Sequence, residues 1–208
     1  MSTGLTQEMM PVMSAEARII YRSALRKQLI ERRLALSAAD CAFFSASVCK
    51  HLQHSFPQLA ALRVAFCWPV KNEPDLRPLI RFWLATGAAG FTALLPLINE
   101  PGAALGFRTW TPASRMIEDR YGIPTPAEGE LLLPQALLIP VNAFDAAGYR
   151  VGYGGGFFDR TLAALNPAPL SIGVGFELSR VDSIHPEAHD VGLDAMVTEA
   201  GVFRNDGS

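Results

Sequence analysis

Cysteine is scarce in this 208-residue chain, and long apolar runs are absent. The three cysteines form no CxxC pair and are odd in number, so we expect reduced thiols rather than a disulfide framework. Residues 1–13 lack the continuous apolar core of a secretion signal. The apolar stretch around 131–141 is interrupted by Pro134 and is too short to cross a bilayer. These absences predict a soluble, cytoplasmic protein with no membrane partner. The cysteines are Cys41, Cys49 and Cys67.

An excess of charge of one sign is also lacking. The chain has 18 basic and 20 acidic side chains, which leaves a formal net charge of −2 at pH 7. Proteins that bind nucleic acid in general are usually basic overall, so the charge argues against a nucleic-acid partner. Half of the residues are hydrophobic, and at this length they can bury a sizeable core.

The pattern of apolar residues predicts a single α/β domain over 14–208, preceded by a flexible leader over 1–13. Its mostly parallel central sheet is flanked by helices and joined by an N-terminal helical segment. Ser14 is a plausible N-cap of the first helix, and Ser37 with Asp40 resembles a capping box at the second. Residues 99–134 carry most of the Pro and Gly punctuation and are expected to form loops. Helices are expected over 14–36, 37–54, 75–88 and 157–165, and strands over 62–70, 91–98, 105–110, 135–141, 170–177 and once or twice within 194–203.

Four glycines stand within five positions, directly before the last expected helix. Neither common phosphate fingerprint is present: GxGxxG would need glycine at Phe157, and no Gly-Lys-Ser/Thr follows. A glycine-rich loop that enters a helix N-terminus nevertheless suits an anion, because bare N–H groups can point at phosphate oxygens. Arg150 could add a charged contact and Asp159 could hold Mg²⁺. The alternative is a turn that merely allows tight packing. The glycines are Gly152, Gly154, Gly155 and Gly156.

The first expected helix is rich in arginine. Arg18, Arg22 and Arg26 are four residues apart and therefore share one helical face, where like charges repel slightly. Such a face is ordinarily solvated, but it would be favourable against a bound polyanion. The basic residues of this segment are Arg18, Arg22, Arg26, Lys27, Arg32 and Arg33.

The segment LLIPVNAFDAAGYRVGYGGGFFDR (137–160) resembles the signature of the 5-formyltetrahydrofolate cyclo-ligases, also called 5,10-methenyltetrahydrofolate synthetases. Four weaker segments agree with the family in the same order, so the resemblance spans about residues 20 to 200. They are RSALRKQLIERR, VKNEPDL, YGIPTP and HPEAHDVGLDAMVTE.

The resemblance implies a ligase that needs ATP and Mg²⁺ and that cyclises 5-formyltetrahydrofolate to 5,10-methenyltetrahydrofolate, releasing ADP and phosphate. The formyl oxygen would be phosphorylated and then displaced by the folate N10. The implied ATP contacts are Arg22, Arg26, Arg150, Gly152, Tyr153, Gly154, Gly155, Gly156, Phe157 and Phe158. The implied substrate contacts are Trp68, Glu73, Tyr153 and Phe157, and the implied Mg²⁺ ligands are Asp159 and Asp190. We add Trp110 as a surface on which a flat ring could stack.

This chain departs from the family pattern in three places. Phe157 and Phe158 replace a tyrosine pair, which removes two hydroxyls. Arg22 stands where lysine is common, and an arginine fork is not equivalent to an ammonium group. Thr125 stands in place of an acidic residue in the YGI-x-P turn, so no role is assigned to that turn.

Simpler interpretations remain open for several residues. Trp68 and Trp110 lie on apolar runs and could be core residues, and Glu73 could simply begin a helix. An alternative function is an enzyme that acts on a phosphorylated small metabolite without ATP, similar to a sugar-phosphate isomerase. A nucleotide- or RNA-binding module is less favoured, because its basic face lacks aromatic residues. A monomer or weak homodimer is expected.

Overall fold

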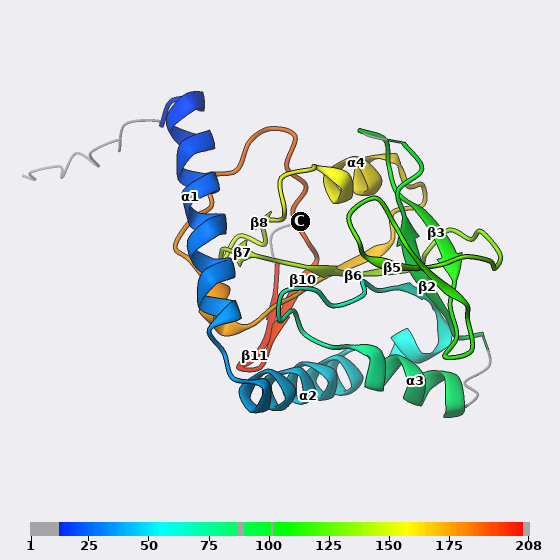
Figure 1. Cartoon of the computed structure of the whole chain (residues 1–208). Helices are drawn as coiled ribbons and strands as arrows, with labels where there is room; N and C mark the ends of the chain where they lie inside the picture. Colours follow the sequence, from blue (N-terminus) through cyan, green and yellow to red (C-terminus); the bar gives the residue numbers. More distant parts are fainter. Residues whose placement is uncertain (1–12, 87–89, 101, 206–208) are drawn as a thin grey trace, which may run out of the picture.

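A central sheet organises the residues that this computed structural model describes, which are 13–86, 90–100 and 102–205. Within them the sheet has seven strands in the order β11-β10-β9-β6-β1-β2-β3 (Figure 1). The five inner strands pair in parallel, and β3 and β11 are antiparallel edges. The expected α/β class with a mostly parallel sheet is therefore confirmed. The strands are β1 (Arg63–Ala65), β2 (Thr92–Leu97), β3 (Gly106–Thr109), β6 (Ala136–Pro140), β9 (Leu170–Val174), β10 (Ala195–Thr198) and β11 (Gly201–Arg204).

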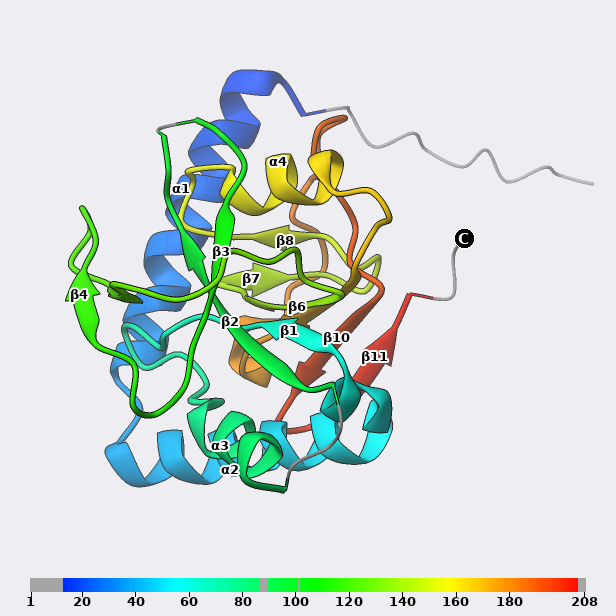
Figure 2. The same cartoon turned by 90° about the vertical axis from the view of Figure 1, so that its right-hand side faces the viewer.

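Helices cover both faces of the sheet, because successive strand residues point to opposite sides. On β6, Leu138 packs in the core beneath α2 (Ala38–Ser55) and α3 (Arg77–Thr86). Its neighbour Ile139 faces the opposite core cluster, against which α4 (Phe157–Ala164) lies. Figure 2 shows α2 and α3 below the sheet and α4 above it. Both faces of β6 are thus buried, as the continuous apolar run predicts.

Helix α1 (Ala15–Leu34) does not lie on either face but crosses the edge where the parallel strands end. Its buried Leu25 and Leu29 form a small cluster with Ala143, Val151 and Ile184. Ser14 caps it by accepting a hydrogen bond from the Ala17 N–H, as expected. The helix thereby brings its basic residues to the carboxyl ends of the strands, where open α/β sheets bind ligands.

The predicted cap of α2 is also confirmed, since the Ser37 hydroxyl accepts from the Asp40 N–H and donates to its carboxylate.

The expected strand over 62–70 is wrong beyond Ala65. Pro69 cannot donate to a ladder, and Lys71 and Asn72 turn the chain with positive φ angles of 49° and 58°.

Residues 99–134 are more ordered than expected. Besides β3, which was expected over 105–110, they contain a separate antiparallel hairpin, β4 (Met116–Glu118) and β5 (Pro124–Pro126). A second small pair, β7 (Ala143–Phe144) and β8 (Arg150–Val151), follows β6. Two 3₁₀ turns, η1 (Pro57–Ala61) and η2 (Glu177–Ser179), complete the elements.

The expected leader falls on residues 1–12, outside the described part, apart from Met13. In the described segments no helix is both long and apolar enough to span a membrane.

Candidate active site

The glycine loop, residues 152–156, joins β8 to the N-terminus of α4. Gly154 and Gly156 have positive φ angles of 94° and 62°, which glycine adopts without strain. Two arginines hold the loop from outside. The Arg26 Nε donates to the Gly152 carbonyl at 2.7 Å, and the Arg160 Nη2 donates to the Gly155 carbonyl at 2.5 Å.

These contacts leave the amide groups of the loop free. A trans peptide places its N–H opposite its carbonyl, so the N–H groups of Tyr153 and Gly156 point away from the two arginines. Among the described residues, no acceptor pairs with the N–H groups of 153–159. A row of unpaired amides at a helix N-terminus is a ready site for an anion.

The glycines also make room for side chains of the protein itself. A Cβ at Gly156 would lie 2.7 Å from the Arg160 Nη1, and one at Gly155 would lie 2.8 Å from the Phe157 ring. At Gly154 the nearest atom would be the Arg26 Nη2 at 3.3 Å, whereas a Cβ at Gly152 would meet nothing within 4 Å. A side chain at three of the glycines would therefore crowd Arg26, Phe157 or Arg160, none of which belongs to the sheet, and one at Gly152 would crowd nothing.

Two ion pairs lie beside the loop. Arg22 donates to both oxygens of Asp190 at 2.7 and 3.0 Å, and the buried Arg150 donates to the Asp159 Oδ1 at 3.0 Å. The Val191 N–H also donates to Asp159, which ties the two pairs together through the chain. The basic face of α1 is therefore not simply solvated: Arg22 and Arg26 are packed against the site.

The surroundings of Asp190 favour its ionised form. Burial opposes ionisation, but the Arg22 hydrogen bonds and the Glu187 N–H outweigh it and lower the pKa of Asp190. The same carboxylate raises the pKa of Arg22. The pair is thus fully charged at neutral pH.

The two carboxylates differ in how well they suit a magnesium ion. In Asp159 only Oδ1 accepts hydrogen bonds from described residues, and 22% of the side chain is exposed. In Asp190 both oxygens are occupied and only 5% is exposed. Nowhere in 13–86, 90–100 or 102–205 do three His, Cys, Asp or Glu side chains gather as a metal cluster. Asp159 therefore fits a cation held mainly by phosphate oxygens, and Asp190 fits one only by giving up a contact to Arg22.

A cavity of about 450 Å³ opens beside the loop. Its lining is mainly apolar and includes four residues of the loop and of the first turn of α4, namely Tyr153, Gly155, Phe157 and Phe158. The predicted Trp68 and Glu73 line it from the segment after β1, and Tyr121, Ile123 and Pro124 line it from the β4–β5 hairpin. The structure thus gives the YGI-x-P turn a place in the site that sequence reasoning did not assign.

At one end of the cavity Glu73 is only 5% exposed. The Tyr153 hydroxyl donates to its Oε1 at 2.7 Å, and the Val70 N–H donates to its Oε2 at 3.0 Å. Burial raises the pKa of Glu73, although these hydrogen bonds and the cations Arg33 and Lys71 oppose the rise. Arg33 was grouped with the solvated basic residues, yet it is 1% exposed and bonded to Tyr153. The position of Arg33 in the sequence does not distinguish it from the other basic residues of this segment, so its burial was not predicted.

The two tryptophans predicted for the site differ in position. Trp68 lines the cavity, and Arg77 lies over its ring at 4.7 Å. Trp110 is 3% exposed and packs edge-on against Phe66 and Trp68. Trp110 is therefore a core residue, and the suggestion that a substrate ring stacks on it is wrong.

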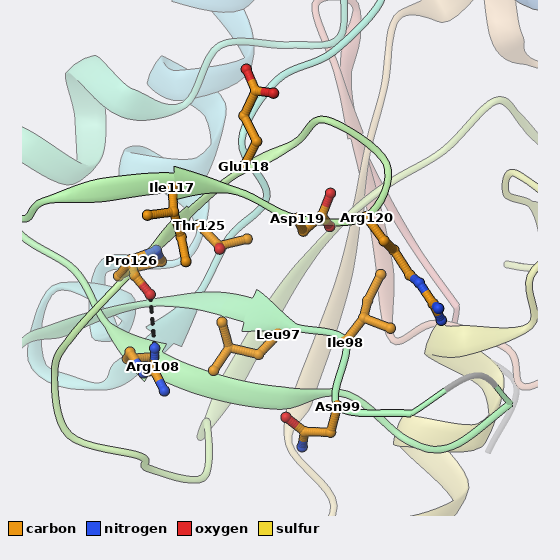
Figure 3. Close-up of a pocket in the computed structure, with 10 residues that line it drawn as sticks. All are labelled: Leu97, Ile98, Asn99, Arg108, Ile117, Glu118, Asp119, Arg120, Thr125 and Pro126. Atoms are coloured by element: carbon orange, nitrogen blue, oxygen red, sulfur yellow. Dashed lines mark hydrogen bonds between the residues drawn. The ribbon is translucent and has the colours of Figure 1, made fainter.

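A second cavity of about 430 Å³ lies between the β4–β5 hairpin and the β2–β3 pair. Figure 3 shows Arg108 in its lining, where it donates a hydrogen bond to the Pro126 carbonyl. The departure noted at Thr125 falls in this lining, away from the glycine loop. Because the two cavities share Ile98 and Asp119, they are neighbours on one side of the hairpin.

Comparisons with known proteins agree with this geometry. Residues 18–199 match the 5-formyltetrahydrofolate cyclo-ligase family. The 5-formyltetrahydrofolate cyclo-ligase of Escherichia coli K12 is 32% identical over 71% of this chain and 83% of its own length. That of Haemophilus influenzae is 27% identical over 83% and 94%, respectively.

Solved structures show the same fold. The 5,10-methenyltetrahydrofolate synthetase of Aquifex aeolicus superposes with a TM-score of 0.75 at 29% identity, over 90% of this chain and 94% of that one. The corresponding Mycoplasma pneumoniae structure has a TM-score of 0.69 at 21% identity, over 86% and 98%. The family match over residues 18–199 spans the positions of the glycine loop, of both ion pairs and of the cavity lining. The chain therefore belongs to the 5-formyltetrahydrofolate cyclo-ligase family of enzymes.

Proposed function

We propose that this protein converts 5-formyltetrahydrofolate to 5,10-methenyltetrahydrofolate with ATP and Mg²⁺, releasing ADP and phosphate. One observation carries the proposal beyond family membership. The loop whose N–H groups are free for phosphate also supplies Tyr153 and Gly155 to the wall of the apolar cavity, and the first residue of α4, Phe157, joins them there. A phosphate donor and a flat organic substrate would thus meet at one short segment.

On this proposal the loop N–H groups and the guanidinium of Arg26 bind the ATP phosphates. Arg22 and Arg150 stand behind them, each already bound to a carboxylate. Asp159, through its free oxygen, would hold Mg²⁺, and Asp190 would be a second ligand if Arg22 shifts. When bound, Mg²⁺ would neutralise charge on the phosphate oxygens.

The cavity would bind the folate. Phe157 and Trp68 provide apolar surface for its rings, and Glu73 can accept hydrogen bonds from ring N–H groups. Phe157 cannot donate a hydrogen bond, unlike the tyrosine common in the family. Contact and shape at this position must therefore suffice in this protein.

The chemistry needs positioning more than a nucleophilic side chain. The formamide oxygen is a poor leaving group, so it first takes the γ-phosphoryl group and ADP leaves. The folate N10 then attacks the activated carbon and releases its proton, the C–O bond breaks, and inorganic phosphate departs with the oxygen as the ring closes. The protein contributes by aligning the two substrates and by holding the phosphate charge.

The test is direct. Purified protein is mixed with 5-formyltetrahydrofolate and Mg²⁺, with and without ATP, and the absorbance of methenyltetrahydrofolate is followed. We expect product only with ATP, at one ADP per product. Absence of product from protein shown to be folded would contradict the proposal and favour the enzyme acting on a phosphorylated metabolite.

A further inference from the structure

Arg33 occupies an unusual position for an arginine. It lies in the last turn of α1 yet is 1% exposed, and it is among the largest fully buried side chains of the described residues. Long charged side chains are rarely buried so completely unless every donor has a partner. The groups that Arg33 contacts therefore indicate which part of the site it supports.

Two of those partners anchor the chain around the cavity. The Arg33 Nε donates to the Lys71 carbonyl at 2.8 Å, and Nη1 donates to the Val141 carbonyl at 3.3 Å. In return the Asn72 side-chain amide donates to the Arg33 carbonyl at 3.2 Å. Lys71 and Asn72 both have positive φ angles, which non-glycine residues keep only where their surroundings enforce them. Arg33 thus helps to hold a strained turn that leads into Glu73.

The third partner is the hydroxyl of Tyr153. The Arg33 Nη2 donates to this oxygen at 2.9 Å, and the hydroxyl donates its one hydrogen to the Glu73 Oε1 at 2.7 Å. Because the hydroxyl accepts from a guanidinium, which can only donate, its own hydrogen is directed at Glu73. The Arg33 Nη2 itself lies 3.8 Å from that carboxylate oxygen.

The charge balance points the same way. Burial raises the pKa of Glu73, and the cations near it, Arg33 and Lys71, act in the opposite direction. The other titratable groups facing this carboxylate are the Tyr153 phenol and the Cys67 thiol, and Glu73 raises the pKa of both after burial has done so. Without Arg33, a neutral carboxylic acid would become more favourable at this position.

We infer that Arg33 is a positioning residue for the folate. It keeps Tyr153 and Glu73 aligned so that Glu73 presents its oxygens as acceptors to a planar heterocycle with adjacent N–H donors, such as an amino-oxo-pyrimidine ring. This inference rests on the proposed function. Arg33 does not touch the substrate; it acts through Tyr153 and through the turn at Lys71.

The experiment compares Arg33→Met, which keeps an unbranched apolar stem but removes the charge and the guanidinium donors, with Arg32→Met. Arg32 is the exposed neighbour and serves as the matched control. Binding of 5-formyltetrahydrofolate is measured without ATP, and binding of ATP is measured without folate. We expect Arg33→Met to weaken folate binding about 30-fold or more while ATP affinity changes less than about threefold, and Arg32→Met to change neither.

Two further variants keep the test sharp if Arg33→Met folds poorly. Tyr153→Phe removes the bridging hydroxyl with little change in volume, and Arg33→Lys keeps the charge but not the fork. We expect a folate-specific loss from the first and partial recovery in the second. Glu73→Gln combined with Arg33→Met should bind folate no worse than Glu73→Gln alone, because the two residues act in one chain of contacts.

A structural role alone predicts a different pattern. If Arg33→Met and Tyr153→Phe lower folate and ATP affinity together, in proportion to lost thermal stability, the inference is overturned. Additive losses in the double variant would overturn it as well. If the wild type binds and converts the folate while Arg33→Met binds it equally well, only this inference fails. If the wild type binds no folate at all, the proposed function fails with it.

Discussion

Two arginine–carboxylate assemblies lie near the glycine loop, an outer one of Arg22 and Asp190 and an inner one of Arg33 and Glu73. They differ in contact geometry and in the pKa of the carboxylate. In the outer assembly Arg22 contacts Asp190 directly at 2.7 Å, and the pKa of Asp190 is lowered even though burial opposes this. In the inner assembly Arg33 and Glu73 are 3.8 Å apart with the Tyr153 hydroxyl between them, and burial raises the pKa of Glu73.

The difference shows that the contact geometry matters more than the residue pair. The direct pair keeps both of its groups charged beside the loop, where the proposed function would place phosphate. An indirect pair in the interior leaves the carboxylate with hydrogen-bonding capacity for a neutral ring. Both assemblies use α1, which supplies Arg22 and Arg33 eleven positions apart.

The largest expected effect is at the other ion pair beside the loop, Arg150 with Asp159, and comes from Asp159→Asn. The change removes the charge that would hold Mg²⁺ but keeps an oxygen to accept from Arg150 and the Val191 N–H. We expect turnover to fall by about 10²–10³-fold, as for the loss of one electrostatic contact in a transition state. Unfolding free energy should fall by no more than roughly 1–3 kcal/mol.

The measurements are Mg²⁺-dependent turnover and urea unfolding, with Asp182→Asn as the control because Asp182 is an exposed carboxylate. Turnover that falls only in proportion to the folded fraction would show that Asp159 merely supports Arg150.

Next in size is the loss of the direct pair in Asp190→Asn. A carboxylate with a lowered pKa stabilises the fold above its unfolded pKa, near 3.8, and loses that contribution as pH falls through the lower folded value. At pH 7 the variant should therefore unfold roughly 1.5–3 kcal/mol more easily, since a charged hydrogen bond is lost.

Urea unfolding of both proteins, repeated from pH 7 downward through 3.8, checks the sign. The difference in unfolding free energy between the two proteins should shrink as the pH falls. A gap that stays constant with pH would mean that Asp190 contributes shape rather than charge.

The loop between the assemblies is tested by Gly152→Ala. Its Cβ would meet no protein atom within 4 Å, so the protein itself does not require glycine there. If the loop cradles phosphate, the methyl group should lower ATP affinity by about tenfold with no change in melting temperature. Calorimetric titration with ATP measures this, and unchanged affinity would show that phosphate does not approach Gly152.

The sequence predicted the sheet well because its cues are local. Alternating helices and apolar strands indicate parallel pairing, and Ser14 and Ser37 mark helix starts by their own chemistry. The strand expected over 62–70 was predicted too long, since the turn at Lys71 and Asn72 depends on Arg33, which is distant in sequence. The β4–β5 hairpin was missed because its segment was expected to form loops.

The site was predicted unevenly for the same reason. Motif order pointed to Trp68, Glu73 and the glycine loop, and all of them border one cavity. The prediction for Trp110 was wrong because no local feature of the sequence shows whether an aromatic residue on an apolar run faces a cavity or the core. Arg33 was missed because burial is decided by tertiary packing, which sequence periodicity does not encode for a single arginine.

The smallest effect concerns Asn142, which follows the carbonyl of Val141 that Arg33 contacts. Asn142 is also 1% exposed, but unlike Arg33 neither atom of its side-chain amide has a partner among the described residues. A buried amide without hydrogen bonds has lost its hydration and gains no protein contact in exchange, which destabilises the folded state. Asn142→Leu, which has a similar volume, should therefore raise the unfolding free energy by about 1 kcal/mol and leave folate and ATP binding unchanged. Urea unfolding measures the gain, and a loss of stability would show that the Asn142 amide has a hydrogen-bond partner in solution.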